Sequence, residues 1–513
     1  MSRIALTIGF AVVSAFAGLC TAGSTAINSW LNYGGNSSRT PIAVDGPDTV
    51  SSSNLAWVAG TDPWDPVYAI DFEWASTPVL HAGKVFAYAH YYDSSGSHVS
   101  NQVIAFDCQT GDVAWATVVD KAYMDSWSSP AIDTEHNLVL IGSGTNVYAL
   151  DIITGQIQWQ TALQAPVVNA SVCIADDLDN GRAYITDYTG YSDGGRLYCI
   201  NLDPNDVDTN PYEPGEIVWS DSIGATSGNS PAYKDGTVYV ACVSQNSWDG
   251  EGSDNGAVFA YDADADQPVR VWQTSSSQFE GFFGAVTVTK EGFLYAANYD
   301  FYGTGDNSAL CKIDCADGSI VWVTQTERTN STPVVVADTV YICGGVNGYG
   351  SRPKVQAFRD QGSNAVKLWE TPETMSIGGS TNQVVYANGK LYVGGRQADE
   401  YSFDPYSQLF ILDADKTPAD PGFIISRYSG CGSSSAATYD SVYSIGYDGL
   451  HKFYQPGYAG DINDDGTLDH ADILLLAEEW TYDGAVGLKR SDLNLDGRVD
   501  MKDQALIAGE WNR

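Results

Sequence analysis

Basic residues and histidines are scarce in this sequence, and no long apolar segment follows the amino terminus. Lysine and arginine number 25 against 64 aspartates and glutamates, which gives a formal net charge of −39. A surface this acidic repels phosphate groups, so nucleic acid and anionic membranes are excluded as partners. After residue 19 no stretch approaches the roughly 20 apolar residues that a membrane-spanning helix needs. We therefore expect no membrane span.

The cysteines and histidines form none of the patterns expected of a metal or catalytic site. None of the nine cysteines belongs to a Cys-x-x-Cys pair, and no histidine lies near Cys311 and Cys315. Apart from Cys20, the cysteines are therefore expected to be buried thiols or disulfides, and the sequence cannot choose a pairing. The six histidines accompany no Ser-His-Asp or metal-protease motif. The sequence thus identifies no catalytic residue.

The amino terminus has the features of an export signal. Residues 4–19 form one apolar run behind Arg3, and small residues follow at positions 20–24. The run is shorter than a membrane span, and small residues are what a signal peptidase site requires. We predict a signal peptide at residues 1–24 and a secreted protein, extracellular or at the cell surface. A retained anchor and a lipid-anchored Cys20 are the alternatives.

One pattern recurs between about residues 54 and 455. An alternating apolar strand runs into a polar turn and a second strand that ends in tryptophan, as in VIAFDCQTGDVAW and LCKIDCADGSIVW. The recurring tryptophans are Trp115, Trp159, Trp219, Trp272, Trp322 and Trp369. Their spacings, between 44 and 60 residues, fit one four-stranded propeller blade per repeat.

A strand that begins with small residues precedes each hairpin, for example STPVLHAGKVFAYA and NSPAYKDGTVYVAC. Eight such strands occur, and small residues suit the crowded strands nearest a propeller axis. The last repeat stops early, at residues 450–453, while Trp57 lies on an unpaired strand at the amino end. We predict a mainly β fold, an eight-bladed β-propeller over residues 25–457, closed where the Trp57 strand pairs with residues 442–453. A β-sandwich is the alternative.

These repeats resemble the eight-bladed propellers built from pyrroloquinoline-quinone-type repeats. That group includes quinoprotein alcohol dehydrogenases and the propeller lipoprotein of bacterial outer-membrane protein assembly. The resemblance is specific for fold and weak for function. In the dehydrogenases a disulfide between adjacent cysteines lies against the quinone, and this chain has no adjacent cysteines. We therefore expect no bound quinone and no quinone-dependent dehydrogenase activity.

Two twelve-residue segments near the carboxyl end share the pattern D-x-N-x-D-G-x-[LV]-D-x-x-D, at residues 461–472 and 492–503. Calcium takes six to eight oxygen ligands, which such a loop supplies from positions 1, 3, 5, 7, 9 and 12. The predicted ligands of the first loop are Asp461, Asn463, Asp465, the carbonyl of Thr467, Asp469 and Asp472. Those of the second loop are Asp492, Asn494, Asp496, the carbonyl of Arg498, Asp500 and Asp503. We predict two bound calcium ions.

Each loop opens a short apolar helix, predicted at residues 471–480 and 502–511. In the first helix, the spacing of Ile473, Leu476, Ala477 and Trp480 is that of a stripe facing a core. The first loop follows YQPGYAG, which cannot be helical, so a helix follows each loop without one preceding the first. Over residues 458–513 this arrangement resembles the type I dockerin, a small α-helical calcium-binding domain.

The dockerin resemblance implies a partner. In that family each half can dock onto a cohesin domain, largely through loop positions 10 and 11 and the following helix. Those positions are His470, Ala471, Met501 and Lys502 in this sequence. The commonest pair in the family is Ser-Thr, so the identity of the cohesin-like scaffold partner stays open.

Two functions are compatible with the sequence. We favour a non-catalytic propeller that its dockerin carries into an extracellular complex, where it binds polysaccharide or protein. The alternative is a carbohydrate-active enzyme, a glycoside hydrolase or lyase, built on the propeller. The aromatic residues before the inner strands fit either function, because they could stack on sugars at one mouth of the ring or pack between blades: Trp74, Trp127, Phe282 and Phe283.

Overall fold

The computed structural model describes most of the chain from residue 29 onward. The described residues are 29–60, 70–124, 126–175, 177–190, 194–243, 255–299, 308–347, 351–397, 400, 405–446, 448–457, 459–463 and 467–511. The predicted signal peptide lies outside them, as do Asp465 and Gly466 of the first calcium loop. Within these ranges, no helix is both long and apolar enough to cross a membrane.

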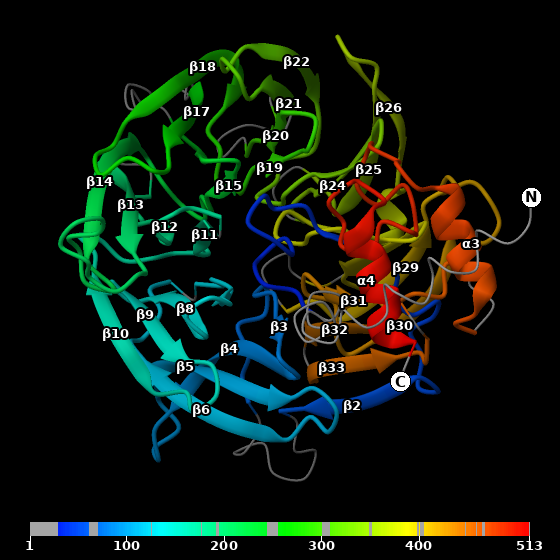
Figure 1. Ribbon diagram of the computed structural model, residues 1–513, viewed down its shortest axis with the longest axis horizontal. Coiled ribbons are helices and arrows are strands. Elements are labelled where there is room, and N and C mark those ends of the chain that lie inside the picture. The colour runs from blue at the N-terminus through cyan, green and yellow to red at the C-terminus, as the bar shows by residue number, and fades with distance from the viewer. Residues whose placement is uncertain are drawn as a thin grey trace, which may run out of the picture.

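Eight β-sheets surround one axis, as the repeats predict (Figure 1). Seven sheets are built from four strands that are consecutive in the sequence, one of them with a fifth strand added at its inner edge. The eighth combines three strands from the carboxyl end with β2 (Leu55–Ala59) from the amino end. β2 pairs antiparallel with β33 (Gly449–Tyr454), with Trp57 opposite Lys452. The predicted closure of the ring is therefore confirmed.

In the first seven blades, four consecutive strands follow one another from the axis outward. Blades one to four contain β3 (Val79–His81), β4 (Lys84–Tyr92), β5 (His98–Asp107), β6 (Val113–Val119); β7 (Ala131–Asp133), β8 (Leu138–Ser143), β9 (Asn146–Asp151), β10 (Ile157–Ala162); β11 (Cys173–Ala175), β12 (Arg182–Thr186), β13 (Gly195–Asn201), β14 (Ile217–Gly224); β15 (Ala232–Lys234), β16 (Thr237–Val243), β17 (Asn255–Asp262) and β18 (Arg270–Glu280). Blades five to eight contain β19 (Thr287–Val288), β20 (Phe293–Ala297), β21 (Ala309–Asp314), β22 (Ile320–Gln325); β23 (Val334–Val336), β24 (Thr339–Gly344), β25 (Lys354–Asp360), β26 (Ala365–Glu370); β27 (Val385–Ala387), β28 (Lys390–Gly395), β29 (Gln408–Asp413), β30 (Ile424–Ser429); β31 (Ala436–Thr438), β32 (Ser441–Gly446), β33 and β2. A short 3-10 helix, η2 (Glu373–Met375), follows β26.

The repeated tryptophans join neighbouring blades. The indole nitrogen of Trp115 donates to the carbonyl of Ile152 in the next blade at 3.3 Å, and Trp57 makes the same bond to Cys108 at 3.1 Å. A Cβ atom at Gly111 would lie 2.8 Å from the Trp57 ring, and Gly111 has a φ of +76°. Glycine alone meets both conditions readily, which explains why the turn before each tryptophan strand so often carries one.

Small residues surround the axis because the blades bond to one another there through serine hydroxyls. The Thr77 amide donates to the hydroxyl of Ser129 at 2.9 Å, the Ser129 amide to Ser171 at 2.9 Å, and the Ser171 amide to Ser230 at 2.8 Å. Each bond links one blade to the next. A larger side chain at these positions would separate the strands, so the small-residue pattern has a direct structural cause.

The amino-terminal segment, residues 29–43, runs along the inner strands, an arrangement that the repeat pattern does not predict (Figure 1). The Leu31 carbonyl accepts from the Ile132 amide, and the Ser37 carbonyl accepts from the Tyr233 amide, each at 2.8 Å. The segment ends in β1 (Ile42–Ala43), which adds in parallel to β27. It thereby contacts blades on both sides of the ring.

Arg39 fixes this segment at the centre. Its side chain is fully buried, and its guanidinium donates to the carbonyls of Tyr33 at 2.6 Å, Pro231 at 2.9 Å and Val172 at 3.0 Å. A buried charge is tolerated only when its donors are satisfied, as they are in this segment. The axis is therefore occupied by the chain itself.

The cysteines between residues 108 and 431 are free thiols, and six of the eight are buried. Of the two alternatives that the sequence left open, the structure has thiols rather than disulfides.

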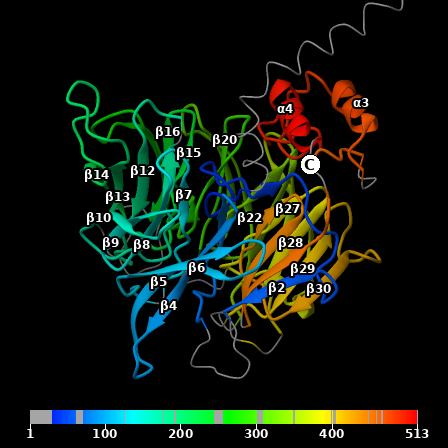
Figure 2. The same ribbon diagram turned by 60° about the horizontal axis from the view of Figure 1, so that its bottom comes forward.

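Two helices form a small module after the propeller, α3 (His470–Glu478) and α4 (Met501–Glu510). Figure 2 shows them at one face of the ring, beyond β27. Their shared core contains Leu476, Val499 and Ile507, together with Val44 from the amino-terminal part of the propeller. The prediction that Trp480 faces the core at the end of the first helix is wrong, because α3 ends at Glu478 and Trp480 is 36% exposed. Ala477 is exposed as well.

Candidate calcium centre and propeller mouth

The second calcium loop brings its predicted ligands together around two buried carboxylates. Asp492 and Asp503 have no exposed surface. The Asp503 side chain accepts from the Leu493 amide and from the Asp500 amide, both at 2.8 Å. Asp492 accepts from the Gly497 amide at 2.9 Å. Backbone donors thus orient both carboxylates inside the loop.

Two further residues of the predicted ligand set of the second loop, Asn494 and Arg498, contact Asp496. The Asn494 amide nitrogen donates to Asp496 at 3.1 Å, and the Arg498 backbone amide donates to it at 3.0 Å. The Lys502 ammonium also lies 2.8 Å from an Asp496 oxygen. An internal cation therefore contacts one ligand at the edge of the loop.

Loop positions 9 and 12 also start the helices. In α4, Asp500 is the N-cap. Its side chain accepts from the backbone amide of Asp503, and the Asp503 side chain accepts from the backbone amide of Asp500, so the two residues form a capping box. Asp469 and Asp472 form the same box in α3. The same carboxylates that are predicted to bind calcium therefore fix where each helix begins.

The first loop repeats the geometry of the second in its described part. Asp461 is 3% exposed and Asp472 is fully buried. Asp472 accepts from the Ile462 amide at 2.7 Å and from the Asp469 amide at 2.8 Å. Asn463 and Thr467 are exposed, and Asp465 lies outside the described residues.

The donor chemistry of the second loop fits a hard cation. Burial and the neighbouring charge of Asp503 raise the pKa of Asp492 to about 7, and burial also raises the pKa of Asp503. Among the described residues, no basic side chain lies within 4 Å of either carboxylate. Oxygen ligands with uncompensated negative charge are what calcium prefers. When bound, a calcium ion would supply the positive charge that balances these carboxylates, and the residues present fit such an ion.

The predicted docking positions are at the surface in both halves of the module. His470 and Lys502 are exposed, Met501 is 51% exposed, and Ala471 is half-buried. The His470 ring contacts the Trp511 ring edge-on, with their centroids 5.7 Å apart. His470 of the first half therefore lies beside the end of α4, whereas Met501 and Lys502 lie at its start, so each half presents its own candidate docking positions.

The module also contacts the propeller directly. The Lys290 ammonium, in the turn between β19 and β20, lies 2.5 Å from an Asp483 oxygen and donates to the Gly497 carbonyl at 2.6 Å. Arg490 lies 2.7 Å from Asp45, the acid that follows β1. The second loop is thus the half that lies against the ring.

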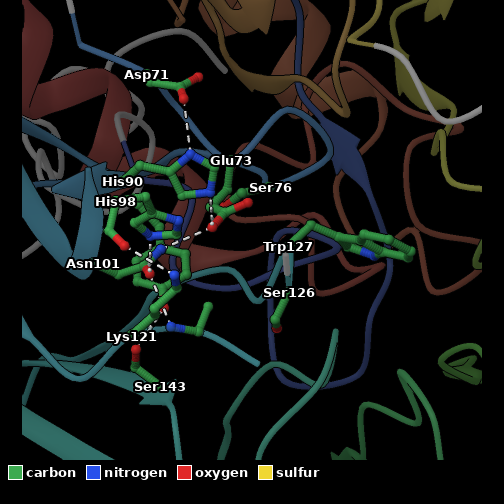
Figure 3. Close-up of polar contacts among 12 residues, drawn as sticks. Asp71, Glu73, Ser76, His90, His98, Asn101, Lys121, Ser126, Trp127 and Ser143 are labelled. Atoms are coloured by element: carbon green, nitrogen blue, oxygen red, sulfur yellow. Dashed lines mark hydrogen bonds and ion pairs between the residues drawn. The ribbon is translucent and has the colours of Figure 1, made fainter. Parts of the chain in front are cut away.

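A second cluster of polar side chains lies at the carboxyl end of β4, and no sequence pattern predicted it. His90 lies between two carboxylates, with Nδ1 2.8 Å from Asp71 and Nε2 2.9 Å from Glu73 (Figure 3). Burial alone would lower the pKa of His90, but the interactions with the carboxylates of Asp71 and Glu73 outweigh it and raise the pKa to about 10. His90 is therefore an imidazolium at neutral pH. These residues meet only because segments that are distant in the sequence pair with one another, so no local motif predicts the cluster.

His98 lies over His90, with ring centroids 4.0 Å apart (Figure 3). Its Nε2 is 3.1 Å from Oδ1 of Asn101, which also accepts from the Ala122 amide. Nδ2 of Asn101 donates to Glu73 at 2.8 Å. Because Oδ1 of Asn101 can only accept, Nε2 of His98 carries the proton and Nδ1 is the basic nitrogen.

The four aromatic residues considered for the mouth divide into two kinds. Phe282 and Phe283 are 1% and 5% exposed and pack inside the propeller. Trp74 and Trp127 are half-buried, and their ring centroids lie 5.4 Å apart. Only the tryptophan pair is therefore placed to meet a ligand.

The described residues that bound the cavity at the axis leave too little room for a quinone. The axial cavity bounded by Tyr33, Trp127 and Phe283 holds only about 10 Å³, in the part of the chain that the structure describes. That is room for about one water molecule. The chain also lacks the adjacent cysteines of the dehydrogenases.

These features define a propeller of quinoprotein-type repeats that carries a calcium-dependent docking domain. Residues 66–213 and 205–404 match the family described as outer membrane protein assembly factor BamB. The chain belongs to this family. Residues 459–510 match the dockerin type I domain. A dockerin domain binds calcium and implies a cohesin partner, and proteins that carry one are typically extracellular or on the cell surface.

Similar proteins share the fold at low identity. The outer membrane protein assembly factor BamB of Yersinia pestis is 25% identical over 318 residues, which is 57% of this chain and 66%, just under two thirds, of that protein. The crystal structure of BamB from Moraxella catarrhalis matches with a TM-score of 0.51 at 18% identity, over 75% of this chain and 98% of that one. A quinohemoprotein alcohol dehydrogenase from Pseudomonas putida matches with a TM-score of 0.53 at 13% identity, over 85% and 78%. These structural likenesses concern the fold alone.

Proposed function

We propose that this chain is an exported protein whose dockerin attaches its propeller to a cohesin-bearing scaffold, and that the propeller takes part in polysaccharide utilisation. Its proposed parts are a signal peptide at residues 1–24, the propeller at 25–457 and the dockerin at 458–513. Two calcium ions, one in each loop, hold the docking face in shape. The propeller acts as a binding module within the complex.

The observation that carries this proposal is the coupling of ligands to helices. Asp503 both lies among the predicted ligands and caps α4, whose first residues are Met501 and Lys502. A cation that fixes Asp503 therefore fixes the start of the docking helix as well. The same relation joins Asp472 to His470 and Ala471 in the first half.

The test is capture of the full-length protein by an immobilised type I cohesin, with calcium and after chelation. We expect capture with calcium and none after chelation. Replacing both predicted docking pairs, His470–Ala471 and Met501–Lys502, by aspartates should abolish capture while calcium stoichiometry stays at two. Capture that survives both chelation and these substitutions would contradict the proposal.

A second candidate function is supported by the cluster at the mouth. His98 has one nitrogen held by Asn101 and the other available as a base, and the Tyr92 hydroxyl donates to Asp71 at 2.5 Å. The Tyr92 and His98 ring centroids lie 5.6 Å apart. A base and a hydroxyl acid of this kind suit a polysaccharide lyase, which removes and donates a proton, better than a glycoside hydrolase, which needs two carboxyl groups.

Release of reducing or unsaturated sugars from polysaccharides by the calcium-loaded protein tests this candidate. Activity should then fall by about 100-fold or more in His98→Ala, as is typical for loss of a general base. Lys416→Met, far from the mouth in the turn after β29, is the control. Activity that is equal in the His98 variant would exclude the cluster as its source.

A further inference from the structure

A large cleft opens at the seam where the ring closes, between the eighth and the first blade. Its volume is about 640 Å³, within the usual range of ligand sites. It is lined by the turn between β3 and β4, the turn between β5 and β6, the turn between β31 and β32, and the end of β33. Since β4 starts at Lys84 in the cleft and ends near the mouth, the cleft lies on the opposite face from His90.

Two lysines of this cleft have no carboxylate within 4 Å among the residues that the structure describes. Nine of the twelve lysines of the chain lie within 4 Å of a carboxylate. The other three, all within the described ranges, are Lys84, Lys121 and Lys452, and both Lys84 and Lys452 line the cleft. In a chain of net charge −39, two unpaired lysines in one cleft are a strong departure from the rest of the surface.

The position of Lys452 in the cleft is fixed by its neighbours. Its side chain is largely buried, and the ammonium donates to the Cys108 carbonyl at 2.8 Å. The rings of Tyr443 and Tyr454 lie beside it, with centroids 5.5 and 5.3 Å from Nζ. An ammonium has three donors, and the Cys108 carbonyl takes one of them.

The nearby acids are engaged by their own turns. Asp440 accepts from the Ser441 hydroxyl at 2.8 Å, and Asp107 accepts from the Gln109 amide at 2.8 Å. Both carboxylates therefore contribute negative charge without pairing with Lys452. A ligand that brings its own anionic group would complete the cleft.

We propose that this cleft binds an acidic sugar, a uronate or a sulfated residue of a polysaccharide, whose anionic group contacts Lys452 and Lys84. The tyrosine rings offer flat faces for the sugar ring, and the side-chain amide of Gln109 and the hydroxyl of Thr438 offer polar contacts for its hydroxyl groups. This inference rests on the proposed role in polysaccharide utilisation and gives it a ligand class. Tyr439 lines the same cleft and packs against the core of the dockerin module, so the ligand would lie beside the docking domain.

The test is calorimetric titration of the full-length, calcium-loaded protein with three oligosaccharides of equal length. Trigalacturonate carries carboxylates, a sulfated trisaccharide carries sulfate esters, and cellotriose is neutral. We expect at least one acidic sugar to bind about tenfold or more tightly than cellotriose, and the difference to shrink at high salt. The better of the two acidic sugars identifies the anionic group.

Lys84→Met and Lys452→Met should each weaken that binding by about tenfold, and Lys121→Met, the third unpaired lysine, should leave it unchanged. Lys84 is less buried than Lys452, so its variant tests the cleft even if the Lys452 variant does not fold. Equal binding of cellotriose, no binding of either acidic sugar, or full affinity in Lys84→Met would overturn the proposal. Cohesin capture measured on the same samples reports separately on the docking function.

Discussion

Two groups of carboxylates in this molecule are neutralised in opposite ways. At the mouth of the propeller, the imidazolium of His90 lies 2.8 Å from Asp71, which is exposed, and 2.9 Å from Glu73, which is fully buried. In the second calcium loop, Asp492 and Asp503 are as buried as Glu73, yet no basic side chain among the described residues lies within 4 Å of them. The first cluster carries its own cation, and the second needs one from solution.

This difference shows how the two regions are stabilised. The propeller is stabilised by hydrophobic cores and by hydrogen bonds between blades, such as that of Trp115. Its His90 cluster is balanced by its own side chains and needs no bound ion. The docking module has one small core, and its loop carboxylates repel one another until a cation is bound. Calcium should therefore control the module and leave the propeller unaffected.

The largest effect is expected from removing the first ligand of both loops. In Asp461→Ala combined with Asp492→Ala, calcium binding should fall from two ions to none, and the module should lose its helices, because folding and binding are coupled. Isothermal titration calorimetry and circular dichroism of the full chain measure both. The main unfolding transition of the propeller should stay where it is.

Asp112→Ala, an exposed acid in the turn between β5 and β6, is the matched control and should leave both ions bound. If the double variant keeps its helical signal, or if the propeller unfolds with the module, the separation between the two regions does not hold.

The next largest effect is expected at the mouth. His90→Gln removes the internal cation and leaves the buried Glu73 with a hydrogen bond from Asn101 but no compensating positive charge, which should cost about 3–5 kcal/mol at pH 6. The folded pKa of His90 is about 10, above its unfolded value near 6.5, so its contribution is complete below pH 6.5 and is lost as the pH rises to about 10. The wild type and the variant should therefore converge in stability near pH 10.

Denaturant unfolding of both proteins at several pH values measures this convergence. His81→Gln is the control, since His81 has no carboxylate within 4 Å among the described residues and burial lowers its pKa. A gap between wild type and His90→Gln that is constant from pH 6 to pH 10 would show that His90 is neutral.

The same contrast explains what could be predicted from the sequence. The blades and the calcium loops are local patterns, each read within one stretch of chain, so the tryptophan repeat and the D-x-N-x-D-G loops sufficed to predict eight blades and a dockerin. The His90 cluster and the cleft at Lys452 are assembled by strand pairing between distant segments, with Lys452 opposite Trp57. Side chains that converge only through such pairing leave no periodic signal, and the segment around Arg39 has no repeat of its own.

A smaller effect should come from Lys502, which reaches Asp496 as an internal cation in competition with calcium. Lys502→Gln frees that ligand, and the calcium affinity of the second loop should rise by up to about fivefold, the value of an exposed ion pair. Lys489→Gln is the control, because Lys489 pairs with Glu479, which is not a predicted ligand. A lower affinity in Lys502→Gln would show that the ammonium stabilises the loop and does not compete with the ion.

The smallest effect is expected where the two regions meet. Lys290 contacts Asp483 and the Gly497 carbonyl across the boundary, but its partner acid is 59% exposed, and such pairs contribute about 1 kcal/mol or less. Lys290→Met should therefore lower the unfolding temperature of the calcium-loaded module slightly and leave the propeller transition unchanged in scanning calorimetry. Lys416→Met, which breaks a partly exposed ion pair on blade seven, should affect neither the module nor its calcium affinity. If Lys290→Met instead weakened calcium binding as strongly as the loss of a ligand, the propeller would be a structural part of the second calcium site. The contrast between a self-sufficient propeller and a cation-dependent module would then apply to the first loop alone.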